Sequence, residues 1–248
     1  MSDLAALRRA AVVGVLLAVV VAVPTTAAFF AAFGWDLQAA LVGDPGAIID
    51  GGPDAVALFH WGAIGDMFSS YLLLVPLALY LHRLLRPRKP WLADLGTVAG
   101  LAYIFVGASG AAILGAVGPP LLEAYATAAP PDRLAILTSF ELLRNVVFFG
   151  LWQTLDPISL GAWVLSVGWL IRPDRRALGP LLVVIGGGLM ALSGLTMLGI
   201  HSLTVLVVGF LVLLLVWAGW VVVDRASLRN RSTPTSGSSS PGAGSATR

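Results

Sequence analysis

Stretches of about 20 apolar residues recur along the whole chain, and they constrain the fold more than any other feature. Backbone polar groups cannot bond to hydrocarbon, so such stretches cross a bilayer as helices, and about 20 residues are needed for each crossing. Of the 248 residues, 58% are hydrophobic and 11% are charged, against about 45–50% and about 25% in soluble domains. The sequence therefore predicts an all-α fold, a polytopic transmembrane helix bundle in contact with the lipid bilayer.

The apolar stretches predict six membrane spans, at 11–33, 57–81, 92–117, 156–171, 178–198 and 202–223. Together they form one transmembrane domain over residues 1–225. The remaining residues, 226–248, are rich in Ser, Gly, Pro and Thr, and we expect a disordered cytoplasmic tail there. The connections on the cytoplasmic side are too short to hold an ATPase, a kinase or a DNA-binding domain.

Basic residues in the short loops predict the orientation. They cluster before the first span and after the second, fourth and sixth spans: Arg8, Arg9, Arg83, Arg86, Arg88, Lys89, Arg172, Arg175, Arg176, Arg225, Arg229 and Arg231. The first loop on the other side carries four acidic residues and no Lys or Arg between positions 34 and 56: Asp36, Asp44, Asp50 and Asp54. Six alternating spans therefore place both termini in the cytoplasm and the chain in the inner (cytoplasmic) membrane of a bacterium.

Trp residues support this map, because Trp collects at both membrane–water boundaries. Trp35, Trp61 and Trp152 fall at the outer boundary, and Trp91, Trp169 and Trp220 fall near the inner one. The basic residues form no continuous face of the kind that binds nucleic acid, so no nucleic-acid partner is expected.

The stretch SFELLRNVVFFG, residues 139–150, places charged side chains in apolar surroundings. Four polar residues in and next to it have helical spacings and share one face: Thr138, Glu141, Arg144 and Asn145. A Glu and an Arg at mid-membrane together cost about 5–7 kcal/mol on insertion scales. We therefore expect residues 132–154 to form an extra helix before the fourth span. It either lies in the outer interface with its polar face toward water or re-enters the bundle, and Asp156-Pro157 predicts an N-cap that starts the next helix.

Asp66 lies about ten residues into the second span, and with Ser69 and Ser70 it forms an i, i+3, i+4 patch. An intramembrane carboxylate is a functional-site hypothesis by default. The structural alternative is a protonated group, or one paired with Arg144, that fixes the helix register. Pro76 in the same span predicts a kink. The candidate site is an intramembrane polar cluster: Asp66, Ser69, Ser70, Glu141, Arg144 and Asn145.

His60 and His201 fall near the outer boundary of the second and sixth spans and are candidate outer-leaflet residues. Two His residues on facing helices can bind a metal or haem. No carboxylate or third His has ligand spacing to either one, and the chain contains no Cys. No metal site and no cofactor are therefore predicted.

The sequence GASGAAILG at 107–115 resembles the GxSG signature of the rhomboid intramembrane serine proteases, with Ser109 in the position of the nucleophile. The resemblance implies His201 as the base. It covers nine residues, it falls in the third span rather than the fourth, and the glycines that follow the family His are missing here. Helix packing is the alternative reading, because small residues repeat along one side of this span: Gly96, Gly100, Gly107, Ala111 and Gly118.

In hydropathy and loop layout the chain is similar to uncharacterised bacterial six-helix integral membrane families, which implies no activity. We expect a non-catalytic scaffold, sensor or partner-binding subunit, whose partner is another membrane protein or a second copy of the chain. The first alternative is a small-solute or proton-coupled carrier that uses Asp66 with Glu141 and Arg144, and the second is the rhomboid-like protease. A carrier predicts a polar cavity that reaches Asp66, whereas a scaffold predicts Asp66 sealed by Arg144 or by a serine.

Overall fold

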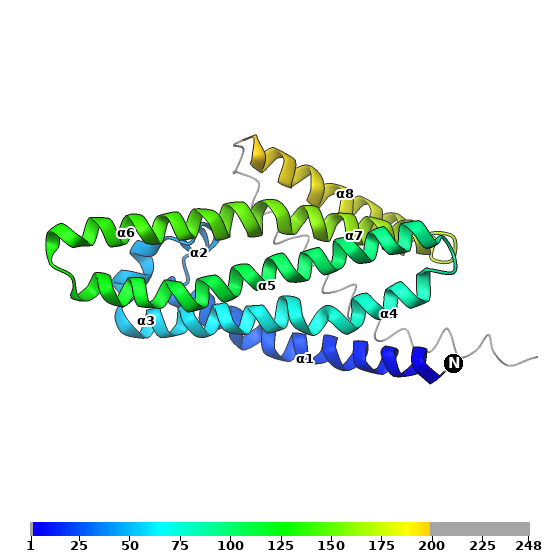
Figure 1. Ribbon diagram of the computed structural model, residues 1–248, viewed down its shortest axis with the longest axis horizontal. Helices are drawn as coiled ribbons and strands as arrows, with labels where there is room; N and C mark the ends of the chain where they lie inside the picture. The colour runs from blue at the N-terminus through cyan, green and yellow to red at the C-terminus, as the bar shows by residue number, and fades with distance from the viewer. Residues whose placement is uncertain (1, 199–248) are drawn as a thin grey trace, which may run out of the picture. The chain divides into compact units, whose positions relative to one another are not determined.

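The computed structural model describes residues 2–198, and within this range the chain is almost entirely helical, without a strand (Figure 1). Five described helices are long and apolar enough to cross a membrane: Asp3–Ala32, Pro45–Leu85, Pro90–Thr127, Pro130–Ile171 and Leu178–Met197. The all-α class is thus confirmed, and the five helices indicate a membrane protein. The predicted sixth span at 202–223 and the predicted tail at 226–248 lie outside the described residues.

Two of the long helices are assembled from shorter segments of different geometry. In chain order the segments are α1 (Ser2–Ala32), α2 (Leu37–Val42), α3 (Pro45–Asp66), the π-helix η1 (Met67–Tyr71), the 3-10 helix η2 (Leu72–Leu74), α4 (Val75–Leu85), α5 (Pro90–Thr127), α6 (Pro130–Arg144), the π-helix η3 (Asn145–Leu155), α7 (Asp156–Ile171) and α8 (Leu178–Met197). One composite helix therefore runs from α3 to α4, and the other runs from α6 to α7 (Figure 1).

Helix α1 runs antiparallel to the composite helix α3–α4. A Cβ atom on Gly14 would lie 2.5 Å from the carbonyl oxygen of Leu73, and one on Gly62 would lie 3.0 Å from the Cα of Phe29. Rising residue numbers on α1 therefore pair with falling numbers on the other helix. The start of α1 lies at the end of the bundle where α4 finishes.

Helix α5 packs through its face of small residues, as the sequence predicts. All five members of that face are buried: Gly96, Gly100, Gly107, Ala111 and Gly118. A Cβ on Gly100 would lie 2.7 Å from the indole of Trp163, and one on Gly107 would overlap the ring of Tyr71. Contacting carbon atoms ordinarily stay about 3.5–4.0 Å apart. Only glycine therefore fits here, and α5 packs directly on α3, η1, α4 and α7.

Helices α7 and α8 also approach through glycines. A Cβ on Gly161 would lie 2.6 Å from the carbonyl oxygen of Gly186, and one on Gly168 would lie 2.8 Å from the carbonyl oxygen of Gly179. In lipid, dispersion packing at such small residues drives helix association. The first glycine of the GGG run at 186–188 is thus explained by close packing.

The two ends of the bundle differ in charge. The connections α4–α5 and α7–α8 form the basic end, which carries Arg83, Arg86, Arg88, Lys89, Arg172, Arg175 and Arg176. There Arg88 donates to the carbonyl oxygen of Leu170 at 2.8 Å and pairs with Asp174. The opposite end contains α2 and the α5–α6 connection (Figure 1). We call it the acidic end, because beside Arg133 it carries Asp36, Asp44, Asp50, Asp54, Glu123 and Asp132.

The helix break expected at Asp156 is wrong. Asp156 has φ −61° and ψ −53°, inside a helix, and its side chain caps no helix. In α geometry the ring of Pro157 would collide with the carbonyl of the residue four positions earlier. The wider π-helical turn of η3 comes directly before this proline and relieves that collision. Residues 132–154, expected as a separate helix, instead run without a break into α7.

Candidate functional site

Two carboxyl groups and two tyrosines gather where η1 faces α5 and the start of α7. Ser70 Oγ donates to Asp66 Oδ1 at 2.6 Å, and the Tyr71 hydroxyl donates to Asp156 Oδ2 at 2.8 Å. The Tyr103 hydroxyl donates to the carbonyl oxygen of Ser70 at 3.0 Å, and the rings of Tyr103 and Tyr71 lie 5.2 Å apart. We call these five residues the carboxyl cluster.

The irregular segment before Pro76 positions one side of the carboxyl cluster. Pro76 cannot donate a backbone hydrogen bond, and the helix changes from π to 3-10 geometry just before it. Tyr71, at the change, has φ −130° and ψ −74°, outside the helical region. Distorted turns of this kind leave room for side chains to reach the backbone. The distortion expected from Pro76 is therefore present, and it lies at the site.

The carboxyl cluster is acidic and lacks a compensating cation among the described residues. Asp66 and Asp156 are linked through η1, since the Tyr71 hydroxyl bonds to Asp156, and within residues 2–198 neither carboxyl group forms an ion pair with a basic side chain. Asp156 is only 8% exposed, and its Oδ1 atom has no hydrogen-bond partner in that range. A buried charge must be neutralised or paired. The two carboxyl groups, Asp66 and Asp156, therefore suit the binding of a proton or a small cation.

The hydrogen bond from Tyr71 to Asp156 sets the relative position of the two carboxyl groups. Asp66 lies five residues before Tyr71 on the composite helix α3–α4, and Asp156 meets the Tyr71 hydroxyl from the start of α7. Two helices thus bring one carboxyl group each to the same part of the bundle.

The other half of the predicted polar cluster lies elsewhere. Within the described residues, Arg144 donates to the side chain of its neighbour Asn145 at 3.1 Å and lies 6.0 Å from the ring of Phe149, without an ion pair to Asp66. Glu141 and Asn145 are exposed. Arg144 lies at the end of α6, separated from Asp156 by the whole of η3, on the side toward the acidic end. Glu141, Arg144 and Asn145 are therefore not brought to Asp66, whereas Ser70 is.

Ser69 is buried in η1 beside the carboxyl cluster. Ser109, the nucleophile implied by the rhomboid resemblance, lies inside the helix α5. The glycines on either side of it, Gly107 and Gly110, face the rings of Tyr71 and Trp152. Both glycines of the motif therefore have a packing role. His201, the implied base, lies outside the described residues.

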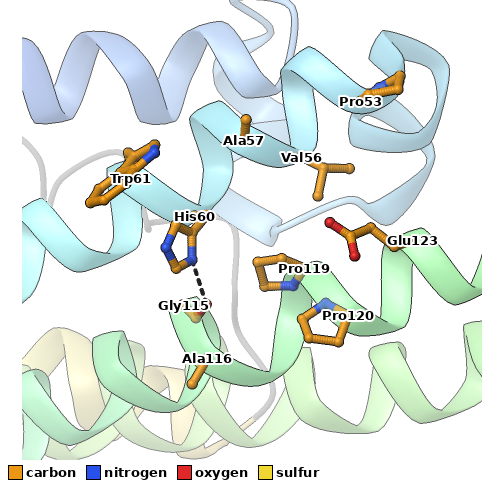
Figure 2. Close-up of a pocket in the computed structure, with 10 residues that line it drawn as sticks. All are labelled: Pro53, Val56, Ala57, His60, Trp61, Gly115, Ala116, Pro119, Pro120 and Glu123. Carbon is orange, nitrogen blue, oxygen red and sulfur yellow. Dashed lines mark hydrogen bonds between the residues drawn. The ribbon is translucent and has the colours of Figure 1, made fainter.

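His60 lines a groove of about 380 Å³ between α3 and α5 at the acidic end (Figure 2). Its Nδ1 lies 2.8 Å from the carbonyl oxygen of Gly115. In a helix this carbonyl would accept from residue 119, but Pro119 has no backbone N–H. The histidine therefore compensates for the missing donor, and its ring also meets Trp61 edge to face at 5.0 Å. Glu123 lies farther along the groove (Figure 2).

Three members of the carboxyl cluster escaped the sequence analysis: Tyr71, Tyr103 and Asp156. Asp156 was interpreted as an N-cap because Asp-Pro commonly starts a helix. The missed signal was the pair of tyrosines inside apolar spans, since a buried phenol hydroxyl needs an acceptor. Comparisons with known protein families, curated proteins and solved structures find no match to this chain.

Proposed function

We propose that this chain is a six-span membrane protein that carries a small solute, coupled to a proton or cation bound at Asp66 and Asp156. One observation carries the proposal: two carboxyl groups on different helices are brought together around Tyr71 and, among the described residues, lack a basic partner. Intramembrane acidic residues are costly, and they commonly mark ion pathways and proton relays. The basic end faces the cytoplasm in this proposal, as the positive-inside rule expects.

The backbone around the two carboxyl groups supports a site that changes conformation. Each group adjoins a π-helical segment, since Asp66 directly precedes η1 and Asp156 directly follows η3. π-Helical turns are rare and often occur at functional sites. A turn that returns to α geometry rotates the residues beyond it, so these segments provide a means of moving one carboxyl group relative to the other.

The proposal changes the residues of the carrier expected from the sequence. Asp156 and Tyr71 take the place of Glu141 and Arg144, because Tyr71 joins the two acidic helices whereas Arg144 bonds to its own neighbour. Glu141 is exposed on the part of the composite helix that lies toward the acidic end, and Arg144 is half-buried there, with its Nε atom lacking a hydrogen-bond partner among the described residues.

A non-catalytic scaffold is the second candidate, and one contact favours it. The Ser70 hydroxyl donates to Asp66 at 2.6 Å and so satisfies one of its oxygen atoms from within the helix. In a scaffold the carboxyl cluster only fixes the register of η1 against α5 and α7. It then stays closed to water under every condition.

Cysteine labelling separates the two candidates, because the chain has no native Cys. Ser70→Cys is placed in the full-length protein in lipid vesicles and treated with a membrane-impermeant maleimide, from each side and over a range of pH and sodium concentration. Trp35→Cys, at an exposed position of the acidic end, gives the maximum signal, and Phe105→Cys, on an exposed face of α5, gives the lipid-facing background. The carrier predicts labelling of Cys at position 70 under at least one condition. Background labelling under every condition, from both sides, refutes it.

A further inference from the structure

Two buried oxygen atoms at the junction of η3 and α7 lack a donor. They are Gln153 Oε1 and Asp156 Oδ1, each with essentially no accessible surface and no hydrogen-bond partner in the described part of the chain. Their residues are three positions apart in the chain, where η3 ends and α7 begins. Buried polar atoms are satisfied in the great majority of cases, so two neighbouring exceptions indicate an unseen water or ion.

In both side chains, Gln153 and Asp156, the other polar atom forms a hydrogen bond that fixes the orientation of the group. Gln153 Nε2 donates to the carbonyl oxygen of Leu41 at 3.1 Å, and Asp156 Oδ2 accepts from the Tyr71 hydroxyl at 2.8 Å. A carbonyl oxygen can only accept, so the amide of Gln153 must turn its NH₂ group to Leu41. Its oxygen is then left as an acceptor, like the free oxygen of the carboxylate.

The backbone at this junction adds a further acceptor, and the nearby donors are already engaged. Pro157 has no N–H, so a carbonyl oxygen one turn before it lacks its helical donor. The Ser193 hydroxyl donates to the carbonyl oxygen of Thr154 at 2.6 Å, and the Thr154 hydroxyl donates to that of Phe149 at 2.7 Å. Trp152 Nε1 donates to α5 at 3.3 Å. The junction therefore offers oxygen acceptors without a free donor among these groups.

We propose that the η3–α7 junction binds a monovalent cation of the size of sodium, with Asp156 and Gln153 as side-chain ligands. Hard cations bind carboxylate, amide and backbone oxygen atoms, and carbonyls freed where membrane helices lose regular geometry are known Na⁺ ligands. One carboxylate at the junction balances one positive charge. The described residues hold no group of three or more Asp, Glu or His for a divalent ion. The inference rests on the proposed carrier function and names its coupling ion.

The acidic end supplies an approach to this site. Gln153 is bonded to α2, and α2 is flanked by Asp36 and Asp44. The segment between residues 34 and 56 contains four Asp and no Lys or Arg. A surface of one charge raises the local concentration of the opposite ion. A cation is therefore attracted to the acidic end, where Gln153 bonds to α2.

Thermal unfolding of the full chain in lipid nanodiscs tests the site, in sodium chloride against choline chloride at equal ionic strength. A ligand that binds only the folded state raises Tm, so wild type is expected to melt at higher temperature in sodium. Asp156→Asn should abolish this difference. Gln153→Leu should raise the sodium concentration for half of the effect by about tenfold, the equivalent of about one lost ligand interaction. Glu141→Gln, which neutralises an exposed carboxyl group outside the segment 34–56, is the matched control and should respond like wild type.

Equilibrium binding of radioactive sodium to the same samples repeats the comparison without relying on unfolding. Binding by wild type and Glu141→Gln, but not by Asp156→Asn, is the expected result. Equal Tm in both salts, or a sodium response that survives in Asp156→Asn, overturns the cation site. A Tm that follows pH alone assigns the junction to a proton or a water and also overturns it, while the proton-coupled carrier stands. Sodium binding without labelling at position 70 refutes the carrier and leaves the site.

Discussion

Gly107→Ala is the substitution that most sharply tests the packing around the carboxyl cluster. The added Cβ would overlap Cε1, Cζ and Cδ1 of the Tyr71 ring. Contacting carbons need about 3.5 Å, so the ring must retreat by roughly 1–2 Å. The hydrogen bond from Tyr71 to Asp156, now 2.8 Å long, would then exceed the usual limit of about 3.2 Å.

The expected loss of stability follows from these two effects. Overpacking a tight interior costs about 1–3 kcal/mol, and a buried acceptor left without its donor costs about 1–3 kcal/mol more. Gly107→Ala should therefore lower the free energy of unfolding by about 2–6 kcal/mol. Thermal unfolding followed by Trp fluorescence in nanodiscs measures it. Gly187→Ala is the matched control, because a Cβ there meets no atom within 4 Å, and alanine favours a helix over glycine by about 1 kcal/mol.

A double substitution tests whether the loss of free energy of unfolding comes from the contact between residue 107 and the Tyr71 ring. With Tyr71→Ala already present the overlapping ring is gone, so adding Gly107→Ala should cost far less than it does in wild type. If Gly107→Ala is as stable as Gly187→Ala, or if its cost is unchanged in the Tyr71→Ala background, the close packing of η1 on α5 is refuted.

Three further substitutions probe the bundle, each by thermal unfolding. Tyr71→Phe removes the donor to Asp156 and should lower the free energy of unfolding by about 1–3 kcal/mol. An unchanged free energy of unfolding would mean that the Asp156 carboxyl group is satisfied without this hydroxyl. Gly186→Ala places a Cβ 2.5 Å from a carbonyl oxygen of α7 and should cost about 1–3 kcal/mol, whereas a stabilised variant would contradict the α7–α8 contact. His60→Leu leaves the Gly115 carbonyl without its side-chain donor and should cost about 1 kcal/mol, and an unchanged Tm would show that water replaces the imidazole.

The fold class and the helix packing could be predicted from the sequence because both depend on local composition. Apolar stretches identify spans by length alone. The glycine face of α5 follows from helical periodicity, and Gly100 and Gly107 indeed lie against aromatic rings. The sequence was therefore sufficient to predict the membrane-spanning helices and the glycine face through which α5 packs.

The part of the carboxyl cluster formed by Tyr71 and Asp156 could not be predicted from the sequence, because it depends on which helices meet. The Asp66–Ser70 contact spans four residues of one helix, and helical spacing predicts it. The Tyr71–Asp156 contact spans 85 positions, and no local pattern encodes it. The local rule for Asp-Pro also favoured an N-cap, but the π-helix before Pro157 allowed the helix to continue and turned Asp156 into the bundle. Tertiary contact overrode local preference there.

Difference infrared spectroscopy of the reconstituted protein tests most directly whether Asp66 and Asp156 form one site. Carboxyl C=O stretching bands are followed during a pH titration of wild type, Asp66→Asn and Asp156→Asn. Interacting acids titrate as a pair, so each substitution should remove its own band and displace the titration of the band that remains. Bands that disappear one at a time, each leaving the other unmoved, would contradict the account.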